Sequence, residues 1–347
     1  MTPVELSRTV LHAVRCAVDD GELSVSVPAR AVVTPPGPGG RGDYATNIAL
    51  QLARPAGRPP LDVAEILRAR IRDTAGVSDV EITGPGFLNI HLERATATAA
   101  LVREILGSGG GPGSYGHTSA LAERVVPLRI PYDIRAEVVA DALVRIIATQ
   151  GGRAEIEHVR PGDPVDLRPV PAPEDPAPLG PDAARWALLY PAVHDRPRIT
   201  AELLLQGECN PLFRVRYAHA RARALGRNAA RLEFGAVPGD LGFDGADGAG
   251  GEARFAGGAS DAAALVRALA EYPNALAQAA AHRAPDRLAR QLVAVADALL
   301  AFQPTVLPLG DEKPSAAHRA RLALAEAAGT VLAGGLSLLG ISAPDYL

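Results

Sequence analysis

Arginines crowd one segment of this chain, residues 211–232, which contains no acidic residue. Asn210 and Pro211 begin it, and these are favoured residue types at the cap and the first position of a helix. Helical spacing then places four of the six arginines roughly on one face: Arg216, Arg223, Arg227 and Arg231. Tyr217 and Arg221 are one turn apart, so they are neighbours on another strip of the same helix.

A guanidinium group beside an aromatic ring suits an unpaired RNA base, because the ring stacks on the base and the guanidinium binds phosphate or a base edge. The alternative is an amphipathic core helix that buries Phe213, Tyr217 and Leu225 and leaves its arginines solvated. His219 fits either interpretation, as an RNA contact or as a satisfied core histidine.

A second candidate site lies in the first hundred residues. Residues 77–93 alternate like two strands joined by a Gly-Pro-Gly turn, and Phe87 and Asn89 follow that turn. They could stack on and read an exposed RNA base. The alternative makes Phe87 a core residue and Asn89 a polar group at a strand edge. Tyr44 and Asn47 stand at a predicted helix start, where Asn47 could equally serve only as a cap.

Other chemistries find little support. The eight histidines have no paired spacing for zinc, and the glycine-rich runs lack the Gly-Lys-Ser/Thr of a phosphate-binding loop. No serine has the context of a nucleophile elbow. Four residues of the glycine-rich stretch 235–258 miss the spacing of a calcium loop, which favours a solvated loop: Asp240, Asp244, Asp247 and Glu252. We therefore expect no catalytic residue, no metal and no cofactor.

The bulk composition is that of a globular protein. A chain of 347 residues with 48% apolar content can form two or three domains with their own cores. The net charge of −4 leaves nucleic-acid binding to local basic patches. Cys16 and Cys209 are too few for a disulfide framework, which favours a reducing cytoplasm. Charges interrupt residues 1–22, unlike a signal peptide, and the longest apolar stretch, 331–341, is too short to span a bilayer.

Periodicity predicts a multidomain protein of α+β and all-α parts. Residues 1–106 form a small α+β domain, with helices over 2–20, 45–57, 61–76 and 95–106 and strands over 23–35 and within 77–93. Residues 107–178 hold a glycine-rich connector, a βαβ unit (125–130, 135–152, 154–159) and most of a proline-rich spacer, 161–181. Residues 179–347 form a helical bundle, with helices over 182–193, 200–206, 211–232, 259–271, 273–283, 285–303 and 315–339.

Both ends of the chain resemble arginyl-tRNA synthetases. GDYATNIALQLARPAGRPP (42–60) and GPGFLNIHL (84–92) are similar to that family's additional N-terminal domain, which cups the tRNA corner at its D-loop. LGPDAARWALL (179–189) resembles the start of the DALR anticodon-binding domain, with Asp182, Ala183, Ala184 and Arg185 at its motif. NPLFRVRYAHARARAL (210–225) is similar to the core anticodon helix, and 284–303 and 321–347 continue the match.

The middle of the chain departs from that family. ADALVRII (140–147) resembles the helix that follows the family's paired-histidine motif, so Ile130, Pro131, Tyr132 and Asp133 stand where those histidines should be. Ile and Pro side chains donate no hydrogen bond to ATP phosphates, and an aspartate repels them. The family's lysine-rich loop has no counterpart, because the single lysine, Lys313, lies within the anticodon-domain match. The resemblance therefore predicts that residues 107–178 hold a reduced remnant of the catalytic domain and a proline-rich linker, and that this chain alone carries out no adenylation.

The sequence thus predicts a cytoplasmic, non-catalytic tRNA-binding protein, with tRNA-Arg as the expected partner and an accessory or carrier role. Its predicted contacts on the anticodon side are Arg185, Asn210, Phe213, Arg216, Tyr217, His219, Arg221, Arg223, Tyr346 and Leu347. Its predicted contacts on the D-loop side are Tyr44, Asn47, Phe87 and Asn89. Two other functions stay open: a protein-interaction module that partners a true synthetase or a biosynthetic enzyme, and a residual or split arginine–tRNA ligase.

Overall fold

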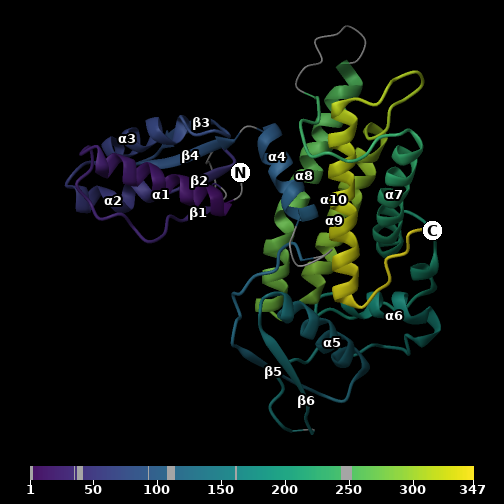
Figure 1. Cartoon of the computed structure of the whole chain (residues 1–347). Coiled ribbons are helices and arrows are strands. Elements are labelled where there is room, and N and C mark those ends of the chain that lie inside the picture. The colour runs from purple at the N-terminus through teal and green to yellow at the C-terminus, as the bar shows by residue number, and fades with distance from the viewer. Residues whose placement is uncertain are drawn as a thin grey trace. The chain divides into compact units, whose positions relative to one another are not determined.

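The computed structural model describes residues 3–34, 36, 42–92, 94–107, 114–160, 162–243 and 252–347. The chain divides into two compact units, Met1–Leu101 and Val102–Leu347 (Figure 1). The division falls inside helix α4 (Arg94–Gly107). The predicted three-part division, with boundaries at 106 and 178, stays a prediction.

The first unit is the predicted α+β domain. Its sheet has four antiparallel strands in the order β1-β2-β4-β3. The strands are β1 (Val33–Thr34), β2 (Tyr44–Thr46), β3 (Val77–Thr83) and β4 (Phe87–Leu92). The helices are α1 (Pro3–Asp19), α2 (Ile48–Ala56) and α3 (Pro60–Arg72). One apolar core joins them, and it includes Leu6, Val10, Ile48, Leu67, Leu88 and Ile90.

The predicted strand pair at 77–93 is confirmed, and its turn requires glycine. Gly86 has a φ of 134°, and a Cβ there would lie 3.0 Å from the backbone oxygen of Pro60. Because L-residues rarely adopt that φ, glycine is what lets β3 turn back tightly beside α3. The turn thereby fixes the register that pairs Thr83 with Phe87.

The predicted strand over 23–35 is wrong for most of its length, since only Val33–Thr34 pairs. Leu23 and Ala31 are buried, and the Ser7 hydroxyl of α1 donates to the Ala31 carbonyl over 2.7 Å. The alternation of apolar and polar residues in this segment is therefore explained by packing against α1, and the segment forms no strand pairing before Val33. Two helix ends also differ: α2 begins at Ile48 because residues 44–46 pair with β4, and α3 ends at Arg72.

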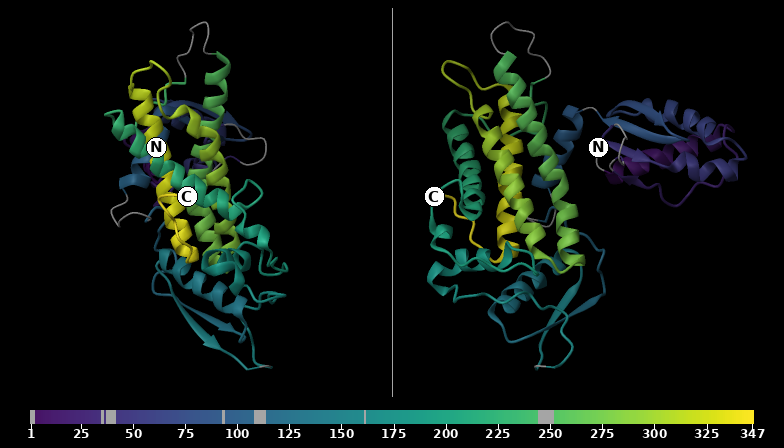
Figure 2. Two further views of the ribbon diagram at one scale, coloured as in Figure 1. Left: turned by 90° about the vertical axis from the view of Figure 1, so that its right-hand side faces the viewer. Right: turned by 180° about the vertical axis from the view of Figure 1, so that it is seen from behind.

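The second unit is a helical bundle with a βαβ unit at one end (Figures 1 and 2). The parallel strands β5 (Val125–Ile130) and β6 (Arg153–His158) flank α5 (Ile134–Thr149). The bundle helices are α6 (Gly180–Leu189), α7 (Pro211–Arg231), α8 (Glu252–Ala281), α9 (Pro285–Phe302) and α10 (Ala316–Leu339). Three 3₁₀ turns, Ala177–Leu179, Ala201–Leu204 and Gln303–Thr305, complete it. The helix predicted over 200–206 is therefore a single 3₁₀ turn.

Helix α10 is the core helix of this bundle. It is long and apolar enough to cross a membrane by length and composition alone, being more extensive than the 331–341 stretch suggests. Its Leu322, Leu332 and Leu336 are nevertheless buried against the neighbouring helices. The hydrophobicity of α10 is thus explained by the bundle that surrounds it.

Helix α8 runs through Pro273, where the sequence predicts two helices, 259–271 and 273–283. Proline removes the hydrogen bond to the carbonyl four residues earlier, which belongs to Leu269. The Tyr115 hydroxyl donates to that carbonyl over 3.1 Å, and its ring stacks on Tyr272. Gly116 fits closely against Pro273, since a Cβ there would lie 3.2 Å from the proline Cα. The 114–117 segment therefore supplies, through Tyr115, the hydrogen bond that the Leu269 carbonyl loses because residue 273 is proline.

A buried guanidinium joins α5 to the segment that follows the βαβ unit. Arg135 has no exposed surface and donates to five backbone carbonyls over 2.7–3.0 Å. These carbonyls belong to Val170, Leu188, Pro191, Ala192 and Asp195. Burial lowers the pKa of Arg135 from its usual value. Every donor of the guanidinium is used. This arginine therefore ties α5 to Val170 of the proline-rich spacer and to residues 188–195, at the end of the next helix and just after it.

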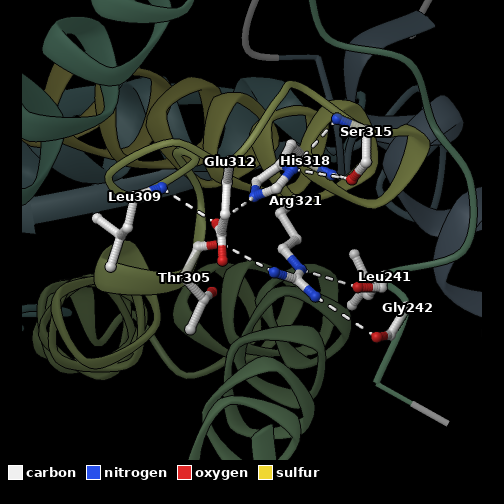
Figure 3. A network of polar contacts seen from close by, with 8 residues as sticks. All are labelled: Leu241, Gly242, Thr305, Leu309, Glu312, Ser315, His318 and Arg321. Atoms are coloured by element: carbon white, nitrogen blue, oxygen red, sulfur yellow. Dashed lines mark hydrogen bonds and ion pairs between the residues drawn. The ribbon is translucent and has the colours of Figure 1, made fainter. Parts of the chain in front are cut away.

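A second polar network holds the connection between α9 and α10 (Figure 3). Arg321 donates to the carbonyls of Leu241 and Thr305 over 2.8 and 3.1 Å. Ser315 caps α10, with its hydroxyl 2.8 Å from the His318 ring. Glu312 accepts from the Leu309 backbone and pairs with His318. The loop that carries Lys313 is therefore pinned at both ends.

The glycine-rich stretch predicted as a loop over 235–258 differs at its end, because α8 begins at Glu252. Two of its acids, Asp244 and Asp247, lie outside the described residues. No group of three or more metal-binding side chains occurs within the described ranges.

Candidate nucleic-acid interface

Helix α7 begins where the sequence places its start. The Asn210 side chain accepts hydrogen bonds from the backbone of Leu212 and Phe213, and Pro211 is the first helical residue. The Asn210 amide also donates to the carbonyls of Leu203 and Leu205 over 2.8 and 2.9 Å. The cap is confirmed, and because both ends of this buried amide are used inside the protein, Asn210 presents no open group to RNA.

Five of the six arginines of α7 fall into two groups. The first is tied to neighbouring helices: Arg214 pairs with Asp297 at 2.9 Å, and Arg221 donates to Gln303 at 3.0 Å. Burial raises the pKa of Asp297, and Arg214 opposes that rise. Tyr217 stacks on Phe213 with ring centroids 5.4 Å apart, and both rings are half-buried. Tyr217 and Arg221 are one turn apart on α7, as predicted, and each also has a partner of its own, Phe213 and Gln303.

The second group contacts residues 341–347, hereafter the tail. Arg223 donates to the Asp345 carboxylate at 3.0 Å, and Arg227 donates to the Asp345 carbonyl at 3.3 Å. The Arg227 guanidinium also lies 4.2 Å from the centre of the Tyr346 ring. Arg216 reaches the hydroxyl of Ser342 at 3.3 Å. The Asp345 carboxylate thus already occupies Arg223, a predicted RNA contact, and the Tyr346 ring lies on the neighbouring Arg227.

The tail also covers His219. The ring donates from Nδ1 to the Pro344 carbonyl at 3.0 Å, and the side chain is buried. Burial lowers the pKa of His219, which favours the neutral ring at pH 7. His219 was predicted either to contact RNA or to be a buried histidine with its hydrogen bond satisfied, and the structure has the second arrangement.

Arg185 is a residue of α6, and its side chain contacts the C-terminal end of α10. It pairs closely with Asp141 of α5 and donates to the Leu339 carbonyl at 3.4 Å. Arg145 donates to the Leu338 carbonyl at 2.8 Å. Cations at a helix C-terminus satisfy its last carbonyls and its dipole. The DALR-like arginine thus joins α6 to α5 and α10, and its side chain is partly exposed.

Two cavities border α7. A groove of about 880 Å³ between α7 and α10 is lined by Arg223, Arg227, Glu326, Thr330 and Asp345, among others. A pocket of about 260 Å³ at the start of α7 brings together four predicted site residues: Asn210, Phe213, Arg216 and Leu347. Tyr346 is exposed and lies on Arg227.

The sequence reasoning missed Glu326 and the role of the tail. Glu326 is an isolated acid within the apolar helix 316–339, and that isolation was the available signal. Its carboxyl lines the groove, where burial raises its pKa and the charge of Arg223 opposes the rise.

The predicted D-loop residues have mixed positions in the first unit. Phe87 is 41% exposed, so the core alternative for it is wrong. Asn89 is buried on β4, a central strand, and donates to the Thr83 hydroxyl at 2.6 Å, so it is no strand-edge group. Asn47 holds the cap position of α2 without a capping bond and accepts from Gln51 instead. Tyr44 is half-buried in β2.

Known protein families match two parts of the chain, one in each compact unit. The DALR anticodon binding domain matches residues 215–347, and the arginyl tRNA synthetase N terminal domain matches residues 7–92. The arginine–tRNA ligase of Renibacterium salmoninarum is 40% identical over 172 residues, which is 46% of this chain and 30% of the ligase. That of Frankia alni is 37% identical over 44% of this chain and 28% of its own length.

The solved structure of Thermus thermophilus arginyl-tRNA synthetase aligns over 100% of both chains with a TM-score of 0.56 and 15% identity, a likeness that concerns the fold alone. The helical unit is thus of the DALR anticodon-binding class. Through this domain and its N-terminal domain, the chain belongs to the arginyl-tRNA synthetase family. The matched segment spans less than a third of the length of these curated relatives.

Proposed function

We propose that this chain is a non-catalytic tRNA-binding member of its family, which holds tRNA-Arg in the cytoplasm as an accessory or carrier. The observation that carries the proposal is the pairing of two family domains, at 7–92 and 215–347, around a short βαβ unit. Binding through two linked domains would raise the overall affinity above that of either domain.

The segment at the start of α5 supports the absence of adenylation. Asp133, which stands at a histidine position of the family motif, caps α5 by accepting from Arg135 and Ala136. Tyr132 is exposed and stacks on His158 with ring centroids 4.9 Å apart. Neither side chain is a positioned cation or neutral donor for the phosphates of ATP.

Two surfaces support RNA binding. On α7, Arg223 is 57% exposed and Arg227 holds an aromatic ring by its guanidinium face. In the first unit, the exposed ring of Phe87 offers a stacking platform at the Gly-Pro-Gly turn. Stacking on aromatic and arginine side chains is how proteins bind unpaired RNA bases.

The binding test uses the whole chain with transcripts of tRNA-Arg and of an unrelated tRNA across a salt series. We expect selective binding of tRNA-Arg, with an affinity that falls steeply as salt rises because phosphate contacts release counterions. Weak or unselective binding at physiological salt would remove the proposal.

Catalysis is tested separately by arginine-dependent exchange of pyrophosphate into ATP, with and without tRNA-Arg. We expect no exchange above the protein-free level. Exchange by the purified chain would support the residual ligase instead, and exchange only with a second protein would support a split ligase.

A protein-interaction module is the second candidate function. The βαβ unit, whose sheet has two strands within the described residues, carries four exposed apolar side chains: Val125, Tyr132, Ile134 and Ile156. A partner that covers this region would bind equally well after substitution of Arg216, Arg221 and Arg223, whereas tRNA binding would suffer.

A further inference from the structure

The groove between α7 and α10 contains the carboxylate of Glu326, to which none of the residues that the structure describes donates a hydrogen bond. Glu326 is only partly exposed, and no donor among the described residues reaches its side chain. Thr330 donates only to the Glu326 backbone oxygen, at 3.0 Å. Half-buried acceptors usually find a donor, so an open one facing a groove marks a place for a ligand with N–H groups.

Small residues make room at this point. A Cβ on Gly226 would lie 3.4 Å from the Glu326 carboxylate, so the acid rests directly over the α7 backbone. Ala222, Gly329, Ala333 and Gly334 also line the groove. Ala222 and Gly329 pack closely against each other, since a Cβ on Gly329 would lie 2.9 Å from that of Ala222. The small residues therefore let a flat ring lie close to the helix backbones at this point, while Leu106, His219 and Leu338 bound the groove further out. The volume of about 880 Å³ is ample for one nucleotide.

Anion-binding groups flank the carboxylate. Arg223 and Arg227 line the same groove and stand one helical turn apart, which is about 5.4 Å. Gly226, against which Glu326 rests, lies between them in the sequence. Arg223 already holds the carboxylate of Asp345 at 3.0 Å, which shows that an anion fits there. A phosphate could replace Asp345 on these guanidinium groups.

The acid limits which base fits. A carboxylate needs two neighbouring donors, and it is repelled by ring nitrogens or carbonyl oxygens that accept. Guanine presents N1–H and N2–H side by side on its Watson–Crick edge. Adenine, cytosine and uracil each place an acceptor next to their donor on that edge. In single-stranded RNA this edge is open to a protein.

We propose that this groove binds an unpaired guanosine of RNA, with the Glu326 carboxylate accepting from N1–H and N2–H of the base. Arg223 and Arg227 bind the flanking phosphates, and Asp345 leaves Arg223 when RNA enters. The proposal rests on the proposed RNA-binding function and makes Glu326 its specificity-determining residue.

The test measures binding of the full chain to four labelled pentanucleotides, UUGUU, UUIUU, UUAUU and UUCUU. Inosine lacks only the N2 amine of guanine, so it isolates one of the two hydrogen bonds. A hydrogen bond to a charged group corresponds to about tenfold or more in affinity. We therefore expect UUGUU to bind at least fivefold more tightly than UUIUU, and UUAUU and UUCUU to bind more weakly still.

Substitution of Glu326 by glutamine gives the decisive comparison. E326Q keeps the size of the side chain, so the groove keeps its shape, and the ratio of UUGUU to UUIUU affinity should fall to within about twofold. R267A, which removes an exposed arginine of α8, is the matched control and should leave that ratio unchanged.

Equal affinities for UUGUU and UUIUU, or an unchanged ratio in E326Q, would overturn the proposal. If the pentanucleotides discriminate while tRNA-Arg is not selected, the proposed tRNA function fails and the guanosine groove stands. If tRNA-Arg binds selectively while the pentanucleotides do not discriminate, only the guanosine groove fails.

Discussion

Two arginine environments in the second unit differ in what their guanidinium groups contact. Arg135 is wholly buried and donates only to backbone carbonyls, so it is part of the scaffold. Arg223 and Arg227 lie at the rim of a groove and hold the side chains and backbone of a seven-residue tail. In this arginine-rich chain, the burial of the guanidinium therefore separates structural arginines from those that an external anion can reach.

The largest expected effect comes from removing the buried arginine. R135M removes five hydrogen bonds to backbone carbonyls, two of them fully buried. Losing even two such bonds costs about 2–6 kcal/mol. We expect unfolding by urea at much lower concentration than for the parent chain, with early proteolysis of residues 160–195. R267A should change the unfolding free energy by no more than about 0.5 kcal/mol. Equal stability of R135M and R267A would contradict the distinction.

The second effect concerns the rim arginines and tRNA. The double variant R223A/R227A should weaken tRNA-Arg binding by about tenfold or more and reduce the salt slope by about two, since two phosphate contacts are lost. Its stability should stay close to the parent value, because both side chains are partly exposed. An unchanged salt slope would place RNA elsewhere on the molecule.

How far these features follow from the sequence depends on the range of the interactions. The start of α7 was predictable, because Asn210 and Pro211 act on the next few residues. The tail on α7 was not, since Arg223 and Asp345 are 122 positions apart and only the folded bundle brings them together.

Long-range packing also explains the wrong predictions. Pro273 signals a helix end locally, yet Tyr115, which satisfies the freed carbonyl of Leu269, comes from 154 positions earlier. Residues 23–32 alternate like a strand, but they pack beneath α1 without a pairing partner. The sequence pattern reports which side chains are buried, and it leaves open what covers them.

A neutral donor provides an intermediate case. Y115F keeps the ring that stacks on Tyr272 and removes only the hydroxyl that donates to Leu269. We expect a loss of about 1–2 kcal/mol of unfolding free energy, less than for R135M, because one buried carbonyl loses its partner. Thermal unfolding of Y115F and of the parent chain measures this loss. An unchanged midpoint would mean that the Tyr115 hydrogen bond to Leu269 does not stabilise the fold.

The smallest effect is expected for E326Q, whose unfolding free energy should differ from that of the parent chain in a way that depends on pH. Burial raises the pKa of this carboxyl above its usual value of 4.5. Between the two values the folded state holds a proton that the unfolded state has lost, so the unfolding free energy falls as pH rises through that window. E326Q should lack this decline and be at least as stable as the parent at pH 7. If the unfolding free energies of E326Q and of the parent chain changed with pH in the same way, a raised pKa of Glu326 would be contradicted.

The loop between α9 and α10 carries Lys313, the single lysine of the chain, in an exposed position. Ser315 and Glu312 fix this loop on either side of it. Glu326 lies ten residues beyond the first residue of α10, roughly 15 Å along the helix. Because every other basic side chain of the Lys/Arg class is an arginine, Lys313 provides the one side-chain amine for chemical labelling. A fluorophore coupled there would report on the bundle while every guanidinium of α7 stays unmodified.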